Sequence, residues 1–245
     1  MDHFLVVLFF FVALLYSSVG LGGGSSYTAL MAIFGVHYEL IPTTSLLLNM
    51  IVTGIGSVNY WRGKHLRIKL ILLFLLTSIP MSYLGGIIPL SKEMFYILLL
   101  ITLLFVVARI YIWNNLRFHI SLSPMGRTIF ILLLGGALGF VAGAVGIGGG
   151  IYLVPLIIIF GLGSEKEAAG TGALFIFVNS LTGTIARYQR GAYDFEFILP
   201  LIAAVLAGGL IGSHFGALKF RPVTIQKTLG FVVIIAIGLL ITKIV

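Results

Sequence analysis

Two glycine runs are the residues in this sequence whose types and spacing could do chemistry. The first lies in "GLGGGSSYTALMAIFG" from Gly20 to Gly35, and the second in "GIGGGIYLVPLIIIFG" from Gly146 to Gly161. After each run we expect a helix to restart, at about Ser25 and Ile151. A helix start presents free backbone N–H groups and a partial positive charge, and glycine lets a ligand approach that backbone closely. The runs therefore predict an anion site built from Gly22, Gly23, Gly24, Ser25, Gly148, Gly149, Gly150 and Ile151.

Hydroxyl and amide side chains near both runs could donate hydrogen bonds to an oxyanion without trapping it. The alternative for each is a hydrogen bond to a carbonyl of its own helix, which is the more common role of a serine or threonine inside a membrane helix. The side chains expected to complete the anion site are Ser25, Ser26, Thr44, Ser45, Asn49, Thr171 and Asn179.

Titratable side chains are scarce within the apolar segments. None of the seven Asp and Glu residues lies in the middle of a long segment, whereas a proton or sodium pathway usually needs a buried carboxylate. This argues against a cation pump and weakens any proton coupling. Glu39, His37 and His214 are the candidates for a proton or gating role, with a loop or interface position as the alternative. Arg109 and Arg187 lie near segment ends, where we expect them to reach water, with an anion relay as the alternative.

The sequence contains no motif that is typical of an enzyme. The chain has no H-E-x-x-H and no G-x-S-x-G, and "GLGGGS" lies in membrane-like surroundings rather than in the strand–helix setting of a dinucleotide loop. Cysteine is absent, which excludes disulfides and thiolate metal sites. We therefore predict neither an enzyme nor a cofactor or metal ion.

The elements that must position these residues are membrane helices. Of the 245 residues, 60% are hydrophobic and only 9% are charged, with a mean hydropathy of +1.17, whereas a soluble domain carries about 25% charged residues. This composition predicts an all-α polytopic membrane protein. The net charge of +8 comes from Lys and Arg in short connections, which is typical of topology signals rather than of a nucleic-acid surface. Residues 1–19 resemble a signal peptide in hydropathy, but they begin with Met1, Asp2 and His3, without Lys or Arg, and no A-x-A cleavage site follows. We therefore expect a retained first membrane segment.

Ten apolar segments follow one another along the chain. We expect them at about 4–19, 25–35, 43–60, 68–89, 93–113, 128–146, 150–162, 166–187, 195–217 and 222–243. Most approach the ~20 residues that span a bilayer. The second and the seventh have roughly a dozen residues, or about 18 Å of helix. Each of these short segments directly follows a glycine run.

An internal repeat relates the two halves. A shift of 126 residues places the first glycine run, together with its closing Ile33-Phe34-Gly35, on the second run and Ile159-Phe160-Gly161. With two further residues of slip, the Tyr-x-Arg-Gly element at Tyr60 recurs at Tyr188. With five segments in each half, an odd number, the second half would be inverted relative to the first, as in many secondary transporters.

The loop charges weigh inverted repeats against parallel ones. With five crossings per half, eleven Lys and Arg fall on one side and four on the other, whereas four crossings give ten and five. Because positive charge collects on the cytoplasmic side, the charges favour inverted repeats with both termini outside the cytoplasm. We place the N-terminal repeat at 1–113, a connecting loop at 114–127 and the C-terminal repeat at 128–245.

Glycines elsewhere fit a packing role, because small residues let membrane helices approach closely. They are Gly135, Gly136, Gly139 and Gly143 in the sixth segment and Gly208, Gly209, Gly212 and Gly216 in the ninth.

The paired motifs "VGLGGGSSYTALMAIFG" and "VGIGGGIYLVPLIIIFG" resemble the sulfite exporter TauE/SafE family, also called the TSUP transporters. The form G-x-G-G-G-x-x-x-x-P is present from Gly146 to Pro155, whereas the first copy has Ala29 in place of the proline. The stretches "PTTSLLLN" and "AAGTGALFIFVNS" also resemble the family, with Gly172 in the second where the first has Ser45. The resemblance covers nearly the whole chain.

This resemblance implies a secondary transporter of the inner membrane, more usually an exporter, for sulfur-containing anions such as sulfite, sulfonates, sulfoacetate or thiosulfate. It also implies a homodimer. The residues alone indicate only a small anion. We expect alternating access, with the anion bound at the glycine runs near the midplane. The alternatives are an anion-selective channel with a polar pore and a proton-coupled uptake permease.

Overall fold

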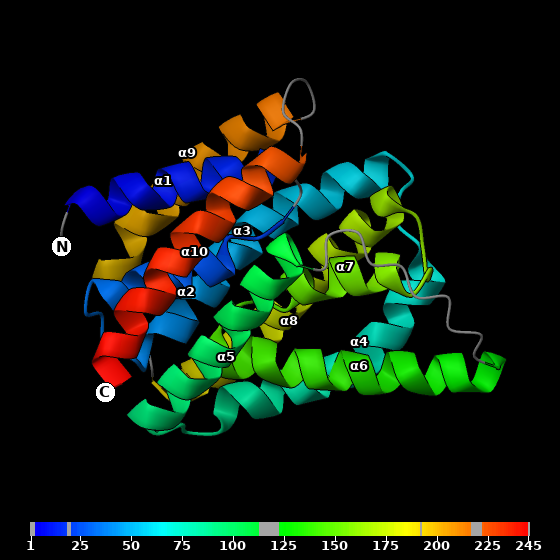
Figure 1. The fold of residues 1–245 in the computed structure, drawn as a ribbon, viewed down its shortest axis with the longest axis horizontal. Helices are drawn as coiled ribbons and strands as arrows, with labels where there is room; N and C mark the ends of the chain where they lie inside the picture. Colours follow the sequence, from blue (N-terminus) through cyan, green and yellow to red (C-terminus); the bar gives the residue numbers. More distant parts are fainter. Residues whose placement is uncertain (1–2, 19–20, 113–122, 192, 217–221, 245) are drawn as a thin grey trace.

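The chain folds into ten α-helices within the residues that the computed structural model describes, which are 3–18, 21–112, 123–191, 193–216 and 222–244 (Figure 1). Each expected apolar segment coincides with one of them. Residues 113–122, most of the expected connecting loop, lie outside the described residues, and the sixth helix begins four residues earlier than expected, at Pro124. The helices are α1 (His3–Ser18), α2 (Gly24–Ile33), α3 (Leu40–Arg62), α4 (Ile68–Ile87), α5 (Lys92–Tyr111), α6 (Pro124–Val145), α7 (Gly150–Ile159), α8 (Glu165–Gln189), α9 (Phe195–Gly216) and α10 (Pro222–Ile244).

The helices have the lengths and surfaces of a membrane protein. Among the described residues, α3, α4, α5, α6, α8 and α9 are long and apolar enough to cross a membrane. Their outward positions are apolar as well, since Leu76, Leu133 and Leu199 are 67%, 70% and 69% exposed. An apolar surface of this extent suits contact with lipid. The prediction of an all-α polytopic membrane protein is confirmed, and so are the short second and seventh helices, which have ten residues each.

Serine side chains cap three of the long helices and neither of the two short ones. Ser91, Ser123 and Ser164 precede α5, α6 and α8, and each hydroxyl accepts a hydrogen bond from the backbone N–H three residues later. Such caps satisfy donors that have no partner within the helix. The N-caps of α2 and α7 are instead Gly23 and Gly149, with no side-chain hydrogen bond. The first N–H groups of the short helices therefore lack a side-chain cap, as do those of α3 and α4.

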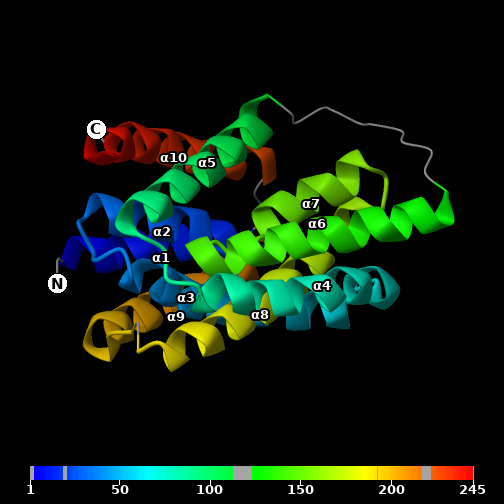
Figure 2. The ribbon, with the colours of Figure 1, turned by 90° about the horizontal axis from the view of Figure 1, so that it is seen from below.

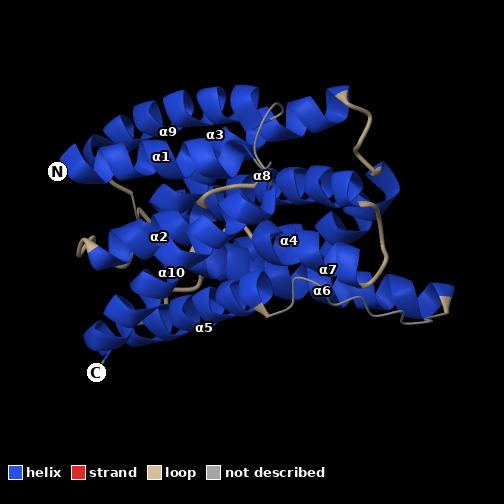
Figure 3. Cartoon of the chain, turned by 45° about the horizontal axis from the view of Figure 1, so that its top comes forward, coloured by secondary structure: helices blue, strands red, loops and turns tan. Residues whose placement is uncertain are grey.

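Each short helix folds back on the helix before it. In the first half, the ring of Phe4 packs against that of Phe34, with centroids 6.1 Å apart. In the second half, Phe130 packs against Phe160, with centroids 4.8 Å apart, and both partners are displaced by the 126 residues of the glycine repeat. The helices α1–α2 and α6–α7 are therefore antiparallel hairpins that carry the glycine runs at their closed tips. Their open ends lie at opposite ends of the molecule (Figures 2 and 3).

Each hairpin packs against a helix from the other half of the chain, α1 along α9 and α6 along α4 (Figure 2). Glycine makes these approaches possible, because a Cβ added at Gly212 would meet the Leu14 carbonyl oxygen and one at Gly143 would meet the Ser82 carbonyl oxygen. The packing role expected for these glycines is confirmed at Gly135, Gly139, Gly143, Gly208 and Gly212. The packing around Gly216 lies outside what the structure describes.

Helices α3 and α8 pack together and run antiparallel. Leu46, early in α3, lies beside Gly183 late in α8, and Tyr60, late in α3, lies beside Gly170 early in α8. The two termini of the chain lie at the same end of the molecule (Figure 1).

Candidate functional site

The two glycine runs meet where the tips of the hairpins reach α3. A Cβ added at Gly24 would lie 2.6 Å from the Ile147 carbonyl oxygen, so the first residue of α2 touches the second run. Residues 21–32 and 142–155 are all buried. The structure therefore brings the expected first and second halves of the anion site together inside the protein.

Two side chains of α3 bridge the runs. The Ser45 hydroxyl donates to the Gly146 carbonyl at 2.7 Å and lies 3.4 Å from the Gly24 carbonyl. The Asn49 amide Nδ2 lies one turn further along α3 and donates to the same Gly146 carbonyl at 3.5 Å. Both side chains are 0% exposed. Two of the predicted site residues thus join the halves of the molecule.

Two buried polar side chains, those of Asn49 and Ser180, lie beside Gly148. A Cβ added there would lie 3.2 Å from Asn49 Nδ2 and 3.4 Å from Ser180 Oγ. Ser180 Oγ is buried and has no hydrogen-bond partner among the described residues, and neither has Asn49 Oδ1, which lies beside Gly22 of the first run. Leaving such groups unpaired costs about 1–3 kcal/mol each. This spot is therefore suited to a small polar ligand that pairs with them.

Ser180 was not among the residues that the sequence predicted for the site. Its neighbour Asn179 was, and that amide donates to the Phe175 carbonyl of its own helix at 2.8 Å, while its Oδ1 has no partner in the described part of the chain. The signal available was a run of Asn and Ser on one segment. Which of the two faces the runs depends on the rotation of α8, and the sequence alone does not specify that rotation.

The two runs differ in backbone conformation. Gly146, Gly148 and Gly149 have φ values of +86°, +79° and +77°, a region that side-chain-bearing residues rarely adopt. Gly23 has an ordinary φ of −85°, but its face is covered by the ring of Tyr27. Glycine is required by backbone geometry in the second run and by close packing in the first, so the half-sites are unequal.

Several predicted residues are held by other contacts. The hydroxyls of Ser25 and Ser26 lie 2.8 and 3.1 Å from the Tyr16 hydroxyl, and Ile151 belongs to the apolar core. Thr44 and Thr171 are buried, with hydroxyls that have no partner in the described ranges.

Thr171 lies next to the end of the second run. Its neighbour Gly172 places its carbonyl oxygen 3.0 Å from a Cβ added at Gly150, the first residue of α7.

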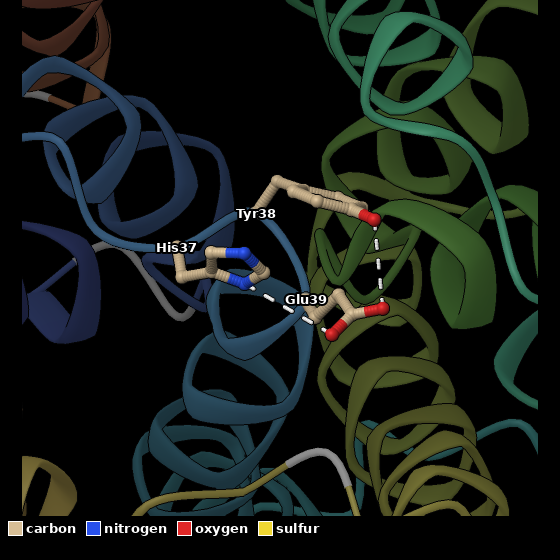
Figure 4. A network of polar contacts seen from close by, with 3 residues as sticks. All are labelled: His37, Tyr38 and Glu39. Atoms are coloured by element: carbon tan, nitrogen blue, oxygen red, sulfur yellow. Dashed lines mark hydrogen bonds and ion pairs between the residues drawn. The ribbon is translucent and has the colours of Figure 1, made fainter.

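Two of the three candidates for a proton or gating role, His37 and Glu39, lie away from this centre. His37 and Glu39 occupy the turn before α3 and the N-cap of that helix, with side chains 63% and 47% exposed (Figure 4). Glu39 accepts a 3.5 Å hydrogen bond from the Tyr38 hydroxyl and lies 4.0 Å from His37 Nδ1. The side chain of His214, in α9, lies outside the described residues. No group of three metal-ligating side chains occurs in the described part of the chain.

The expectation that Arg187 reaches water is wrong. Its side chain is only 3% exposed, and Nε and Nη2 donate to the Gly143 carbonyl at 3.2 and 3.1 Å. Nη2 also donates to the Ala144 carbonyl at 2.6 Å. These carbonyls end α6 just before the second glycine run, and a helix C-terminus attracts a cation. Position near a segment end suggested exposure, but the end of α6 covers the guanidinium.

Comparisons with known proteins agree with one another. A family model described as "Sulfite exporter TauE/SafE" matches residues 5–240. The chain is similar to "Probable membrane transporter protein y4hK" of Sinorhizobium fredii, with 31% identity over 87% of this chain and 87% of that protein. It is also similar to "Probable membrane transporter protein YjnA" of Bacillus subtilis, with 25% identity over 95% and 96% of the two chains. "Probable membrane transporter protein YunE" of the same species is 25% identical over 94% of each chain. No solved structure matches the chain significantly.

Proposed function

The chain belongs to the sulfite exporter TauE/SafE family of membrane transporters, and from this premise we propose that it exports small sulfur-containing anions across the inner membrane. Candidate substrates are sulfite, sulfonates, sulfoacetate and thiosulfate, and the carrier works by alternating access. The observation that carries this proposal is the buried centre where both glycine runs meet Asn49 and Ser180. It combines helix starts without side-chain caps with polar atoms that have no partner in the described residues.

This centre suits an anion more than a cation. Its contributions are two helix N-termini, which carry partial positive charge, and hydroxyl and amide groups that can donate hydrogen bonds. No Asp or Glu is among the buried side chains of the described residues. A tetrahedral or pyramidal oxyanion could accept bonds from the Gly148 region and from Asn49 and Ser180 at once.

Inverted repeats fit the course of the chain. Because each hairpin returns to the side it came from, it contributes no net crossing. Three helices then remain in each half, namely α3–α5 and α8–α10. An odd number of crossings inverts the second half relative to the first, and the antiparallel course of α3 and α8 supports this arrangement. The loop charges then place both termini outside the cytoplasm.

Export of an anion from a negative interior is electrically downhill by about 2.3 kcal/mol per charge per 100 mV. Such a carrier needs no coupling ion, which fits a centre without a buried carboxylate. The halves would rock about the glycine centre and expose it to each side in turn.

Flux in liposomes tests the proposal. Purified protein is first screened by thermal shift against sulfite, sulfate, thiosulfate, methanesulfonate and acetate, because a ligand of the folded state raises its stability. The stabilising anion is then followed in liposomes with an imposed membrane potential. We expect flux that follows the potential, together with counterflow of labelled substrate, which a channel does not show. Flux that ignores the potential and requires a proton gradient would contradict voltage-driven export.

A further inference from the structure

Arg187 is a buried cation without a carboxylate against it. In the described part of the chain, the ion pair recorded is the surface pair of His37 and Glu39. The guanidinium is satisfied by three hydrogen bonds to backbone carbonyls. Those carbonyls carry only a partial charge, of about half a unit at a helix end. Because these partial charges offset only part of the full charge of the guanidinium, the site retains uncompensated positive charge.

The other charged groups at this end of the molecule do not neutralise it. Arg190, also from α8, is half-buried and donates to the Gly86 and Ile88 carbonyls at the end of α4. It adds positive charge. Glu39, at the start of α3, is 47% exposed and makes no ion pair with Arg187. Water therefore weakens its effect on the buried guanidinium.

The guanidinium lies close to the glycine centre. Nη2 is 2.6 Å from the Ala144 carbonyl oxygen, and Ala144 is two residues before Gly146, whose carbonyl Ser45 holds. Two residues of chain span at most about 7 Å. The charge of Arg187 therefore lies within about 10 Å of Gly146, the first residue of the second run. Ser180 lies seven residues before Arg187 on α8, which is also about 10 Å along the helix.

We propose that Arg187 is the residue that selects for negative charge at the glycine centre, with the transported anion as its transient counter-ion. This rests on the proposed function, because it assigns the charge selectivity of that same site. At about 10 Å and an effective dielectric constant of about 20, a unit charge changes the affinity for a monovalent anion roughly tenfold. The effect is roughly a hundredfold for a divalent anion.

Three variants and three ligands of similar shape test the assignment. Arg187→Gln removes the charge, Arg187→Lys keeps it, and Arg190→Gln removes a second arginine that also caps a helix end but is half exposed. Binding of sulfate, methanesulfonate and neutral dimethyl sulfone to purified full-length protein is measured by calorimetry. We expect Arg187→Gln to weaken methanesulfonate about tenfold and sulfate about a hundredfold, and to leave dimethyl sulfone unchanged. Arg187→Lys should stay within about threefold of the wild type for both anions, and Arg190→Gln should change both by a similarly small factor.

A purely structural role predicts a different result. If the arginine only caps α6, the Lys and Gln variants lose affinity equally and without regard to ligand charge, and the assignment is overturned. If Arg187→Gln does not fold, the wild type still decides, since dimethyl sulfone binding as tightly as methanesulfonate would overturn it. If the wild type binds none of the anions in the thermal-shift screen, the proposed function itself fails, which is a separate outcome.

Discussion

Asn49 is the side chain through which the two halves of the molecule share one polar centre. Its amide lies against Gly22 and Gly24 of the first run and beside Gly148 of the second. Ser57, two turns further along α3, is also buried, but its hydroxyl donates to the Thr53 carbonyl of its own helix at 2.6 Å. The sequence left two roles open for such side chains, a contact with the ligand or a hydrogen bond within the helix. Asn49 is placed for the first role, and Ser57 has the second.

We expect Asn49→Ala to weaken anion binding at least about tenfold, because a hydrogen bond to a charged group contributes about 1.5–3 kcal/mol. Ser57→Ala is the matched control and should bind within about twofold of the wild type, since it removes only a bond within the helix. Calorimetric titration with the anion found by thermal shift measures both. Equal affinity in the two variants would remove Asn49 from the site.

At the scale of elements, the two short helices begin at glycines that are needed for different reasons. Gly149 has a left-handed backbone, which costs a residue with a side chain about 1–2 kcal/mol. Gly23 has an ordinary backbone, but a Cβ there would strike the ring and hydroxyl of Tyr27. Changing a neighbouring side chain cannot relieve the strain of a left-handed backbone, whereas it can remove a steric clash.

Gly23→Ala and Gly149→Ala should both lower the thermal stability of the detergent-solubilised protein. Adding Tyr27→Leu should restore part of the loss in the first variant, because leucine lacks the atoms that clash. Adding Phe175→Leu should not restore the second, although it removes the ring atom 2.9 Å from the added Cβ, because the φ of Gly149 is unchanged. Rescue in both double variants, or in neither, would contradict this distinction.

Segment pattern and glycine spacing predicted the elements well and the contacts less well. Apolar length placed all ten helices, and the repeat located both helix restarts within one residue. Hairpin closure depends on distant aromatic pairs such as Phe4 with Phe34, which no local pattern encodes. The same limit explains Arg187 and Ser180, whose environments are set by how α8 packs against other helices. Side chains at helical positions were predictable by type, whereas their rotation toward the centre was not.

At the scale of the whole molecule, the hairpins place the turn before α3 on the same side as the start of α1. The proposed inverted topology then puts His37 and Lys92 outside the cytoplasm and Lys64 inside it. The chain has no cysteine, so single cysteines can be introduced without background.

We expect a membrane-impermeant maleimide to label His37→Cys and Lys92→Cys on intact spheroplasts. Lys64→Cys should react only after the membrane is opened. All three positions are exposed, so labelling reports sidedness rather than burial. Labelling of both His37→Cys and Lys64→Cys on intact spheroplasts would mean that α3 does not cross the membrane and would contradict the proposed topology.

The exchange of packing partners between the halves also sets an order of assembly. Helix α1 lies along α9, and α6 lies along α4. Contacts between residues so far apart in the chain form late, because a long loop must close first. Until α9 has been made, the first hairpin can pack against α3 but lacks the helix that α1 lies along. Neither half can therefore complete its packing alone. A nascent chain that stops before α9 lacks the helix that packs along α1, and α1 leads into the first glycine run.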